Sequence, residues 1–379
     1  MVAPQPPALR AAADYHLRGP TTTPAPQRDR DRFVVDAGGT FREWGTGVTR
    51  PLGGSTLRRL AAALLTGAVL VGGCATNDEP SDPLQVAATL ESATPAPSPD
   101  QSTTPAGTVL PLTGTATALA VAGGTLAVAV DQPPSVQLYT LPDPTPRTVA
   151  LPAPAARLVA AGDRIDATVP TSGVIVSIAT ADATTTSKTV DGGPVDTAVS
   201  GDKTLVAQRD AHSVRVGDRQ VGPITSPDQV LVVGDHAVVL DRLRSAVFDL
   251  DPATDTLGAG LRAGDGATNA VTDRFDRVLV TDTRGGELLA FTANPLIMRQ
   301  RYPVPGGPYG IAYDPRTDLA WVTLTEKNEV VAYHVAGGEP VEKFRFPTVR
   351  QPDSVAVDPG SGRVFIASAD GQGIQVISP

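Results

Sequence analysis

The feature that most constrains the fold is a repeat of about 40 residues in the C-terminal two-thirds of the chain. Its clearest copies are PYGIAYDP at 308–315 and PDSVAVDP at 352–359, which lie 44 residues apart. Each copy is followed by a β-rich run, AWVTL or RVFIAS, and after a loop by another, EVVAYHV or GIQVIS. Short alternating apolar runs separated by Gly, Pro, Asp and Asn predict strands joined by tight turns.

Seven such units can be traced through the sequence. The first strand of each unit is marked by one residue, and successive marks are 33 to 44 residues apart: Leu119, Leu158, Thr197, Val230, Ala270, Ile311 and Val355. A period near 40 with four short strands per unit is typical of a β-propeller blade. The sequence therefore predicts an all-β, seven-bladed β-propeller with four-stranded blades over residues 108–379. A β-sandwich is the competing architecture.

The two ends of the repeat region predict how the ring closes. The last unit ends at Pro379, directly after its third strand, so its fourth strand must come from elsewhere in the chain. Residues 108–112, TVLPL, closely resemble residues 148–152, TVALP, at the end of the first unit. We therefore expect the N-terminal strand at 108–112 to pair into the last blade, which would cover unpaired strand edges.

A lipoprotein signal precedes the repeats. Two arginines stand before the apolar run Leu60–Val71, which is too short to span about 30 Å of hydrocarbon but suits an export signal. Two glycines and the only cysteine follow, and this pattern resembles the bacterial lipobox. The resemblance implies a signal peptide over 48–73, cleavage between Gly73 and Cys74, and diacylglycerol and palmitate on Cys74. Two acyl chains give stable anchoring to a membrane. A buried helix with a core cysteine is the alternative.

The segments that flank this signal show no strand pattern. Residues 1–47 are rich in Pro, Arg and Ala, and we expect a non-native or disordered leader, because translation from Val48 as a GTG codon would omit them. Residues 74–107 form a linker rich in Pro, Ser and Thr, without aromatic or basic residues. Such a segment buries little apolar surface, so the sequence predicts a disordered tether.

The last units resemble a known propeller repeat. They read as a Pro, an Ile/Val-Ala-Tyr/Val-Asp strand, a turn, a β-rich strand and then Val/Ile-x-Val, as in the YVTN and NHL propellers, including YncE-like proteins. The resemblance is good over 307–379, fair over 225–306 and weak over 113–224. With the lipobox and the linker, it implies a conserved lipoprotein of the mycobacterial or actinobacterial type. Some similar propellers hydrolyse lactones at the channel mouth, but no motif assigns such residues here.

Charge and cysteine content exclude several kinds of partner. Residues 75–379 carry 22 basic and 35 acidic residues, a net charge of −13. Nucleic-acid binding needs clustered Lys and Arg, so we expect no nucleic-acid partner. A single cysteine excludes a disulfide framework and a Cys-rich metal cluster. His212, His236 and His334 fall in three different units, so we expect no metal site and no cofactor.

Candidate ligand-binding residues lie where a propeller would bring loops to one mouth of its central channel. The loops that enter the first strands supply six of them: Arg157, Asp196, Asp228, Asn269, Tyr309 and Asp353. The loops between second and third strands carry acidic residues: Asp131, Asp210, Asp241, Asp282, Glu326 and Asp370. These acidic residues would either attract a cation such as calcium or cap turns by accepting backbone N–H bonds, the interpretation that we favour.

Other groups suggest weaker interpretations. Arg242 and Arg244, with Arg209 and Arg215 in the neighbouring unit, form a basic cluster that would either bind an anionic glycan or partner carboxylate, or be solvated. Trp321 and Tyr313 are expected to pack between blades. No G-x-S-x-G elbow and no P-loop ending occur, so no catalytic residue is assigned.

These observations lead to a functional hypothesis. We expect a lipoprotein held by Cys74 on the outer side of the cytoplasmic membrane, where its propeller acts as a binding or scaffolding module. Its partners would be the bilayer and an envelope protein or small ligand. The alternative is an envelope hydrolase, lactonase-like, with its site at the channel mouth. A redox or metal-storage accessory is a third hypothesis.

Overall fold

The computed structural model describes residues 90–143 and 145–379. The predicted leader, the signal peptide, Gly73, Cys74 and the first part of the linker lie outside the described residues. Within the described part of the chain, no helix has the length and apolar character needed to cross a membrane.

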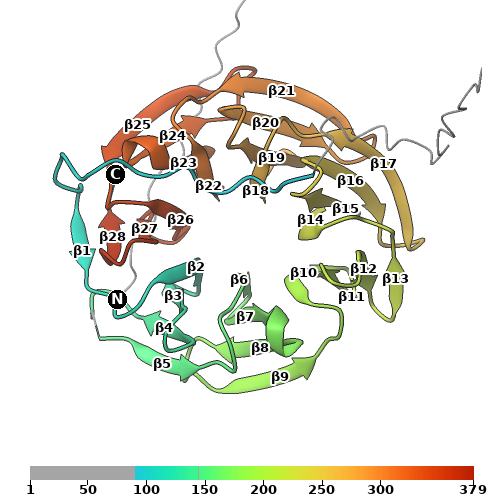
Figure 1. Cartoon of the computed structure of the whole chain (residues 1–379), viewed down its shortest axis with the longest axis horizontal. Coiled ribbons are helices and arrows are strands. Elements are labelled where there is room, and N and C mark those ends of the chain that lie inside the picture. Colours follow the sequence, from blue (N-terminus) through green and yellow to red (C-terminus); the bar gives the residue numbers. More distant parts are fainter. Residues whose placement is uncertain (1–89, 144) are drawn as a thin grey trace, which may run out of the picture. The chain divides into compact units, whose positions relative to one another are not determined.

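The described residues form seven antiparallel sheets of four strands each, arranged as a ring (Figure 1). Blade 1 contains β2 (Ala116–Ala122), β3 (Thr125–Val130), β4 (Ser135–Tyr139) and β5 (Arg147–Ala150); blade 2 contains β6 (Arg157–Ala161), β7 (Arg164–Val169), β8 (Val174–Ala179) and β9 (Thr185–Thr189); blade 3 contains β10 (Pro194–Ser200), β11 (Lys203–Gln208), β12 (Ser213–Val216) and β13 (Arg219–Val221). Blade 4 contains β14 (Pro227–Val233), β15 (His236–Asp241), β16 (Ala246–Asp251) and β17 (Thr256–Arg262); blade 5 contains β18 (Ala267–Thr272), β19 (Arg277–Asp282), β20 (Glu287–Thr292) and β21 (Ile297–Pro303). Blade 6 contains β22 (Pro308–Asp314), β23 (Leu319–Leu324), β24 (Glu329–His334) and β25 (Val341–Pro347); blade 7 contains β26 (Pro352–Val357), β27 (Val364–Ser368), β28 (Ile374–Ile377) and β1 (Thr108–Leu110). The predicted seven-bladed propeller is confirmed, and the sandwich alternative is wrong.

The ring closes through the two ends of the described chain. The strand β1 pairs antiparallel with β28, with Thr108 opposite Val376 and Leu110 opposite Ile374. The strand is shorter than the predicted 108–112, but it lies in the predicted blade. The side-chain amide of Gln375, in β28, also supports this closure, because its Nε2 donates to the carbonyl of Ala106, shortly before β1, at 2.7 Å.

Apolar residues pack between neighbouring blades, with one cluster at each of the seven seams. Second strands such as β3 (TLAVAV) and β23 (LAWVTL) are buried at every position, because neighbouring blades cover both faces of the sheet. Trp321 packs as predicted, between blades 6 and 7, and stacks on Phe344 at 6.0 Å between ring centroids. The seam between blades 2 and 3 has the smallest cluster, formed by Ile175, Val190 and Val206.

The segment that precedes β1 differs from its prediction. Residues 90–106, here called the strap, follow the face that carries the turns between second and third strands, and Figure 1 shows them in cyan beside blades 5 to 7. Ala93 and Ser98 are buried, and the Ser98 hydroxyl donates to the Thr325 carbonyl at 2.6 Å. Asn328 Nδ2 donates to the carbonyl of Pro99 at 3.0 Å.

This part of the predicted disordered linker is therefore ordered. The strap is as polar as the prediction assumed, and it forms no hydrophobic core by itself. It is ordered because the propeller holds it. Side chains of the propeller turns donate to its backbone carbonyls, and these bonds satisfy polar groups that would otherwise need water.

Candidate ligand site in the central channel

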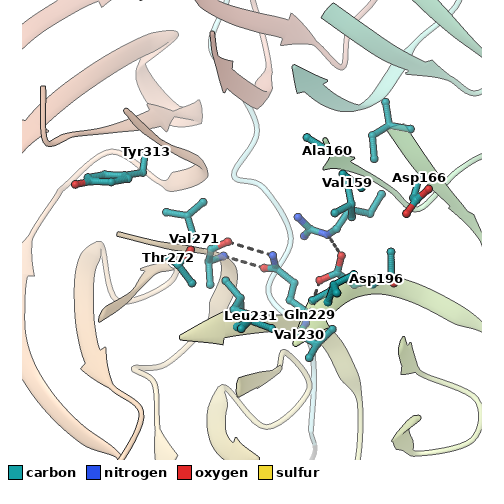
Figure 2. Close-up of a pocket in the computed structure, with 18 residues that line it drawn as sticks. Val159, Ala160, Asp166, Asp196, Gln229, Val230, Leu231, Val271, Thr272 and Tyr313 are labelled. Carbon is teal, nitrogen blue, oxygen red and sulfur yellow. Dashed lines mark hydrogen bonds and ion pairs between the residues drawn. The ribbon is translucent and has the colours of Figure 1, made fainter. Parts of the chain in front are cut away.

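Two adjacent cavities occupy the centre of the ring. The mouth cavity, of about 410 Å³, is lined by the inner strands β2, β6, β18, β22 and β26 and by Arg242. The lumen cavity, of about 630 Å³, is lined mainly by β6, β10, β14 and β18 (Figure 2). Both are lined by Arg157, Leu158, Ala270 and Val271, so these residues mark the boundary between them. Their volumes fall within the range of small-molecule sites, roughly 300–1,000 Å³.

The inner strands begin with an irregularity that shapes the mouth. In every blade except blade 2, the first strand shifts register within its first few residues. Such bulges change the direction in which neighbouring side chains project. The six candidate residues were expected in the loops that enter these strands, and this placement is wrong, because all six lie within the first residues of the strands themselves.

Arg157, the first residue of β6, is the central group of the channel. Its Nε lies 3.6 Å from Asp196 Oδ1 in blade 3, across the weakly packed seam between blades 2 and 3. Its Nη2 donates to Asn269 Oδ1 at 3.4 Å, which connects blade 2 to blade 5 on the far side of the channel. Three of the predicted residues therefore meet at the boundary of the two cavities.

Asp196 is a buried carboxylate behind the Arg157 guanidinium. Desolvation raises the pKa of Asp196 to about 6, while the charge of Arg157 and the N–H of Val230, which donates to Oδ2 at 3.0 Å, act in the opposite direction. The balance shows that burial dominates over the single long ion pair. Asp196 thus lies beside Arg157 in the wall of the lumen, at the distance of a weak ion pair.

Asn269, Tyr309 and Asp353 complete the mouth cavity. Asn269 Nδ2 donates to the carbonyl of Tyr309 at 3.2 Å. Asp353 accepts from Gln351 Nε2 at 2.8 Å, and burial raises the pKa of Asp353 to about 6. The mouth therefore contains an amide, a carboxyl group that titrates near neutrality and the Arg157 guanidinium.

Asp228 lines neither cavity. Its carboxylate accepts from Arg209 Nε at 2.9 Å, from the Ser226 hydroxyl at 2.8 Å and from the backbone N–H of Arg242 at 3.1 Å. These bonds make it a structural group that fixes the turn after β15. The register shift in β14 lies at Asp228, between Pro227 and Gln229.

Two further residues line the channel: Gln229, which the sequence analysis missed, and Arg242, which it placed in a basic cluster but not at the channel. Gln229 lines the lumen and bridges blades 4 and 5, since its Oε1 accepts from Ala270 N–H at 2.8 Å and its Nε2 donates to the Ala270 carbonyl at 3.2 Å (Figure 2). Arg242 lines the mouth, and its Nη2 donates to the carbonyl of Ala93 in the strap at 2.8 Å. Neither residue stands at a repeated position that would have marked it.

Acidic residues at the ends of the second strands cap turns in the two cases described next, where they accept hydrogen bonds from backbone N–H groups. Asp282 accepts from the N–H groups of Asp265 at 2.9 Å, Gly266 at 2.7 Å and Gly285 at 2.9 Å. Asp131 accepts from Thr115 N–H at 3.0 Å. Across residues 90–143 and 145–379, no group of three or more His, Cys, Asp or Glu side chains could hold a metal ion. The calcium interpretation therefore has no support in the described turns.

The described histidines lie away from both cavities. His212 Nδ1 lies 2.7 Å from the carbonyl oxygen of Thr225. His236, at the start of β15, contacts Asp249 through Nδ1 and Asn294 through Nε2. Tyr313, expected only to pack between blades, also lines the lumen, and its hydroxyl donates to Asp318 at 2.8 Å.

Comparisons with known proteins support the architecture. No family model matches the chain, and no curated protein sequence matches it. A chain of hydrazine synthase from Kuenenia stuttgartiensis matches at a TM-score of 0.61 and 14% identity, covering 74% of this chain and 99% of that one. A catalytically inactive variant of virginiamycin B lyase from Staphylococcus aureus, solved with quinupristin, matches at 0.59 and 13%, covering 72% and 98%. The Cps50 (Swd1) propeller domain of Myceliophteria thermophila matches at 0.59 and 11%, covering 72% and 99%.

These matches and the seven sheets define the chain as a seven-bladed β-propeller. Identities this low establish a shared fold, and a propeller scaffold carries many unrelated functions. The residues of the channel must therefore carry any argument about activity.

Proposed function

We propose that the chain is a lipid-anchored propeller of the cell envelope that binds a small ligand in its central channel. The anchor would be an acylated Cys74 on the extracytoplasmic side of the membrane, in a lipoprotein of the YncE-like, YVTN/NHL type from an actinobacterial-type envelope. The proposal rests on the signal sequence for location and on the channel for binding.

The observation that carries the binding proposal is the position of Arg157. A guanidinium has five N–H donors, and Arg157 uses two of them in contacts of 3.6 and 3.4 Å. It lies at the boundary between the mouth and lumen cavities and keeps 30% of its side chain exposed. A cation with unused donors in a concave site is the arrangement expected of a ligand-binding group.

Membrane attachment is tested on the full chain. Wild type and Cys74→Ala are expressed in a bacterial host that processes lipoproteins, and membranes, culture fluid and intact masses are compared. We expect wild type in the membrane fraction with the mass of diacylglycerol plus palmitate, and Cys74→Ala without that mass. A wild-type chain without acyl mass would contradict the anchor, and a precursor that keeps Met1 in the native host would contradict translation from Val48.

Ligand binding is tested by native mass spectrometry of the full chain released gently from membranes. We expect a bound small molecule on wild type and on Arg219→Ala, whose guanidinium lies on the outer strand β13 and is 76% exposed. Arg157→Ala is expected to lose that molecule. Equal occupancy in wild type and Arg157→Ala would show that Arg157 does not hold a ligand.

A second candidate function is an envelope hydrolase of the lactonase-like kind. It is favoured by Asp353, a mouth carboxyl whose pKa is raised by burial to about 6, so that it can exchange a proton near neutral pH. The test is turnover of a panel of lactones by the full chain and by Asp353→Asn. Hydrolysis by wild type that the substitution abolishes would favour this function over simple binding.

A further inference from the structure

Building on the proposed channel site, we infer that its ligand is an amphiphile with one anionic head group. The head would contact Arg157 and Arg242 at the mouth, and the apolar tail would lie in the lumen between β6, β10, β14 and β18. The inference depends on the charges at the mouth, on the residue types that line the lumen, and on the residues that the two cavities share.

The first step concerns the strength of the bonds that Arg157 makes within the protein. Charge-assisted N–H···O bonds are typically about 2.7–2.9 Å long. Arg157 has contacts of 3.6 Å to Asp196 and 3.4 Å to Asn269, both well beyond that range. An incoming carboxylate could form shorter and stronger bonds with this guanidinium without first breaking a strong ion pair.

The second step adds Arg242 from the turn between β15 and β16. Its Nη2 donates to Ala93, but its Nε is buried and has no acceptor among the described residues. An acceptor in the cavity would therefore meet a guanidinium whose donors are not all used within the described protein. Arg242 and Arg157 both line the mouth cavity.

The acidic groups near these cations lose charge as the pH falls. Asp196 is buried beside Arg157 on the lumen side, and Asp353 in the mouth accepts a hydrogen bond from Gln351. Both carboxyl groups have a pKa raised to about 6 by burial, so each is protonated at a higher pH than an exposed carboxyl is. The preference of the mouth for an anion over a cation therefore increases as the pH falls toward 6.

The third step concerns the lumen, whose lining residues are mostly aliphatic in type. Eleven of its eighteen lining residues are Ala, Val or Leu. Three polar side chains of the lining are bonded within the protein: Gln229 to Ala270, Tyr313 to Asp318, and Asp166 to Ser177 at 2.6 Å. Polar groups, among them Arg157, Asp196 and Thr272, also line the lumen, so an apolar tail would gain affinity where it covers the aliphatic side chains.

The test measures probe binding to the full wild-type chain in lipid nanodiscs, with empty nanodiscs subtracted. The probes share a ten-carbon tail and differ in the head group: decanoate, decanol and decylammonium. We expect decanoate to bind about tenfold or more tightly than the other two. Hexanoate should bind more weakly than decanoate by about fourfold for each methylene removed, the ratio equivalent to burying one CH₂.

Matched variants separate the head from the tail. Arg157→Ala and Arg242→Ala should each weaken decanoate binding about tenfold while leaving decanol unchanged, and Arg157→Lys should restore part of the loss. Arg219→Ala is the control for removal of a guanidinium. Ala198→Leu, which fills the lumen from β10, should weaken decanoate more than hexanoate. Thermal unfolding of each variant checks that the fold is retained.

The outcomes distinguish this inference from the proposed function. Equal binding of decanol or decylammonium would overturn the anionic head, and equal binding of hexanoate and decanoate would overturn the apolar tail. If no probe binds but the native molecule is still lost in Arg157→Ala, the ligand class is wrong and the channel site stands. If wild type carries no molecule and binds no probe, both proposals fail.

Discussion

Arg242 and Ala93 are 149 residues apart in the sequence, yet Arg242 Nη2 donates to the Ala93 carbonyl at 2.8 Å. This bond joins the strap to a residue of the mouth cavity. Gln351 makes a second connection of the same kind, since its Nε2 donates to Asp353 Oδ1 at 2.8 Å and to the Ala96 carbonyl at 3.2 Å. The strap is therefore part of the framework that positions the mouth.

Loss of the Ser98 hydroxyl should loosen the strap. Ser98 Oγ donates to the Thr325 carbonyl at 2.6 Å in buried surroundings and accepts from Gln351 N–H at 3.0 Å at a partly buried position. We expect Ser98→Ala to lower the free energy of unfolding by about 1–3 kcal/mol, because the Thr325 carbonyl loses its partner, whereas Gln351 N–H keeps a bond to Asn328 Oδ1 at 3.2 Å. Hydrogen exchange should accelerate in residues 90–106. Ser102→Ala, at an exposed position of the same segment, is the control and should change neither measurement.

Ring closure should be sensitive to a methyl group at Gly107. Gly107 has φ +73°, and a Cβ there would lie 2.1 Å from the Val376 carbonyl oxygen in β28. Gly124 has a similar φ of +75° but open space around the Cβ position, so Gly124→Ala reports the backbone strain alone, about 1 kcal/mol.

We expect Gly107→Ala to cost clearly more stability than Gly124→Ala, because β1 must also move away from β28. Chemical unfolding of the two variants measures the difference. Equal losses would mean that the pairing of β1 with β28 adds little to the stability of the ring.

Gln229 should matter for the seam between blades 4 and 5. Its side-chain amide bonds both the N–H and the carbonyl of Ala270, and it is buried. Gln229→Met keeps the side-chain length but leaves both backbone groups without a partner, so we expect a loss of about 2–4 kcal/mol in unfolding free energy. Gln220→Met, at an exposed position of the outer strand β13, is the matched control. A loss no larger than that of the control would contradict the bridging role.

The buried carboxyl groups predict how stability varies with pH. Burial raises the pKa of Asp196 and of Asp241 to about 6, from an ordinary value of 3.8. Between these values the folded protein binds protons that the unfolded chain has released, so stability is fully present below about pH 4 and falls as pH rises to about 6. Asp196→Asn should reduce that slope, as measured by denaturant unfolding at a series of pH values.

Asp182 provides the contrast for this measurement. It is exposed, and the N–H of Thr184 lowers its pKa, so its contribution is present above pH 4 and is lost only as the pH falls further. Asp182→Asn should therefore leave the slope between pH 4 and pH 6 unchanged. A slope that Asp196→Asn does not alter would mean that this carboxyl group ionises normally in the folded protein.

The seven blades could be predicted because the packing of each blade requires particular residue types at short, regular spacings in the sequence. A second strand covered on both faces must be apolar at nearly every position, as in β23, and the turns between strands need Gly, Asp or Pro. The closure was predictable because residues 108–112 resemble the end of the first unit.

The channel was predicted only in part, for physical reasons that differ between residues. Arg157, Asn269, Tyr309 and Asp353 do line the mouth, and Asp196 lines the lumen. The register shift in β14 places Asp228 against Arg209 and leaves its neighbour Gln229 in the channel wall, and such shifts have no clear sequence signal. The strap was missed because it is held by bonds such as Ser98 to Thr325, which are 227 residues apart in the sequence.

Because the strap fixes residues 90–106 against the propeller, the short segment before it would limit how far the propeller could lie from an acylated Cys74. Fifteen residues lie between Cys74 and Leu90, where the described chain begins, and the 16 steps from one to the other can span at most about 55 Å when fully extended. Acylation of Cys74 would thus keep the opening beside Ala93 within one such length of the outer leaflet. A fatty acid leaving that leaflet would then need only a short passage through water before it met Arg242.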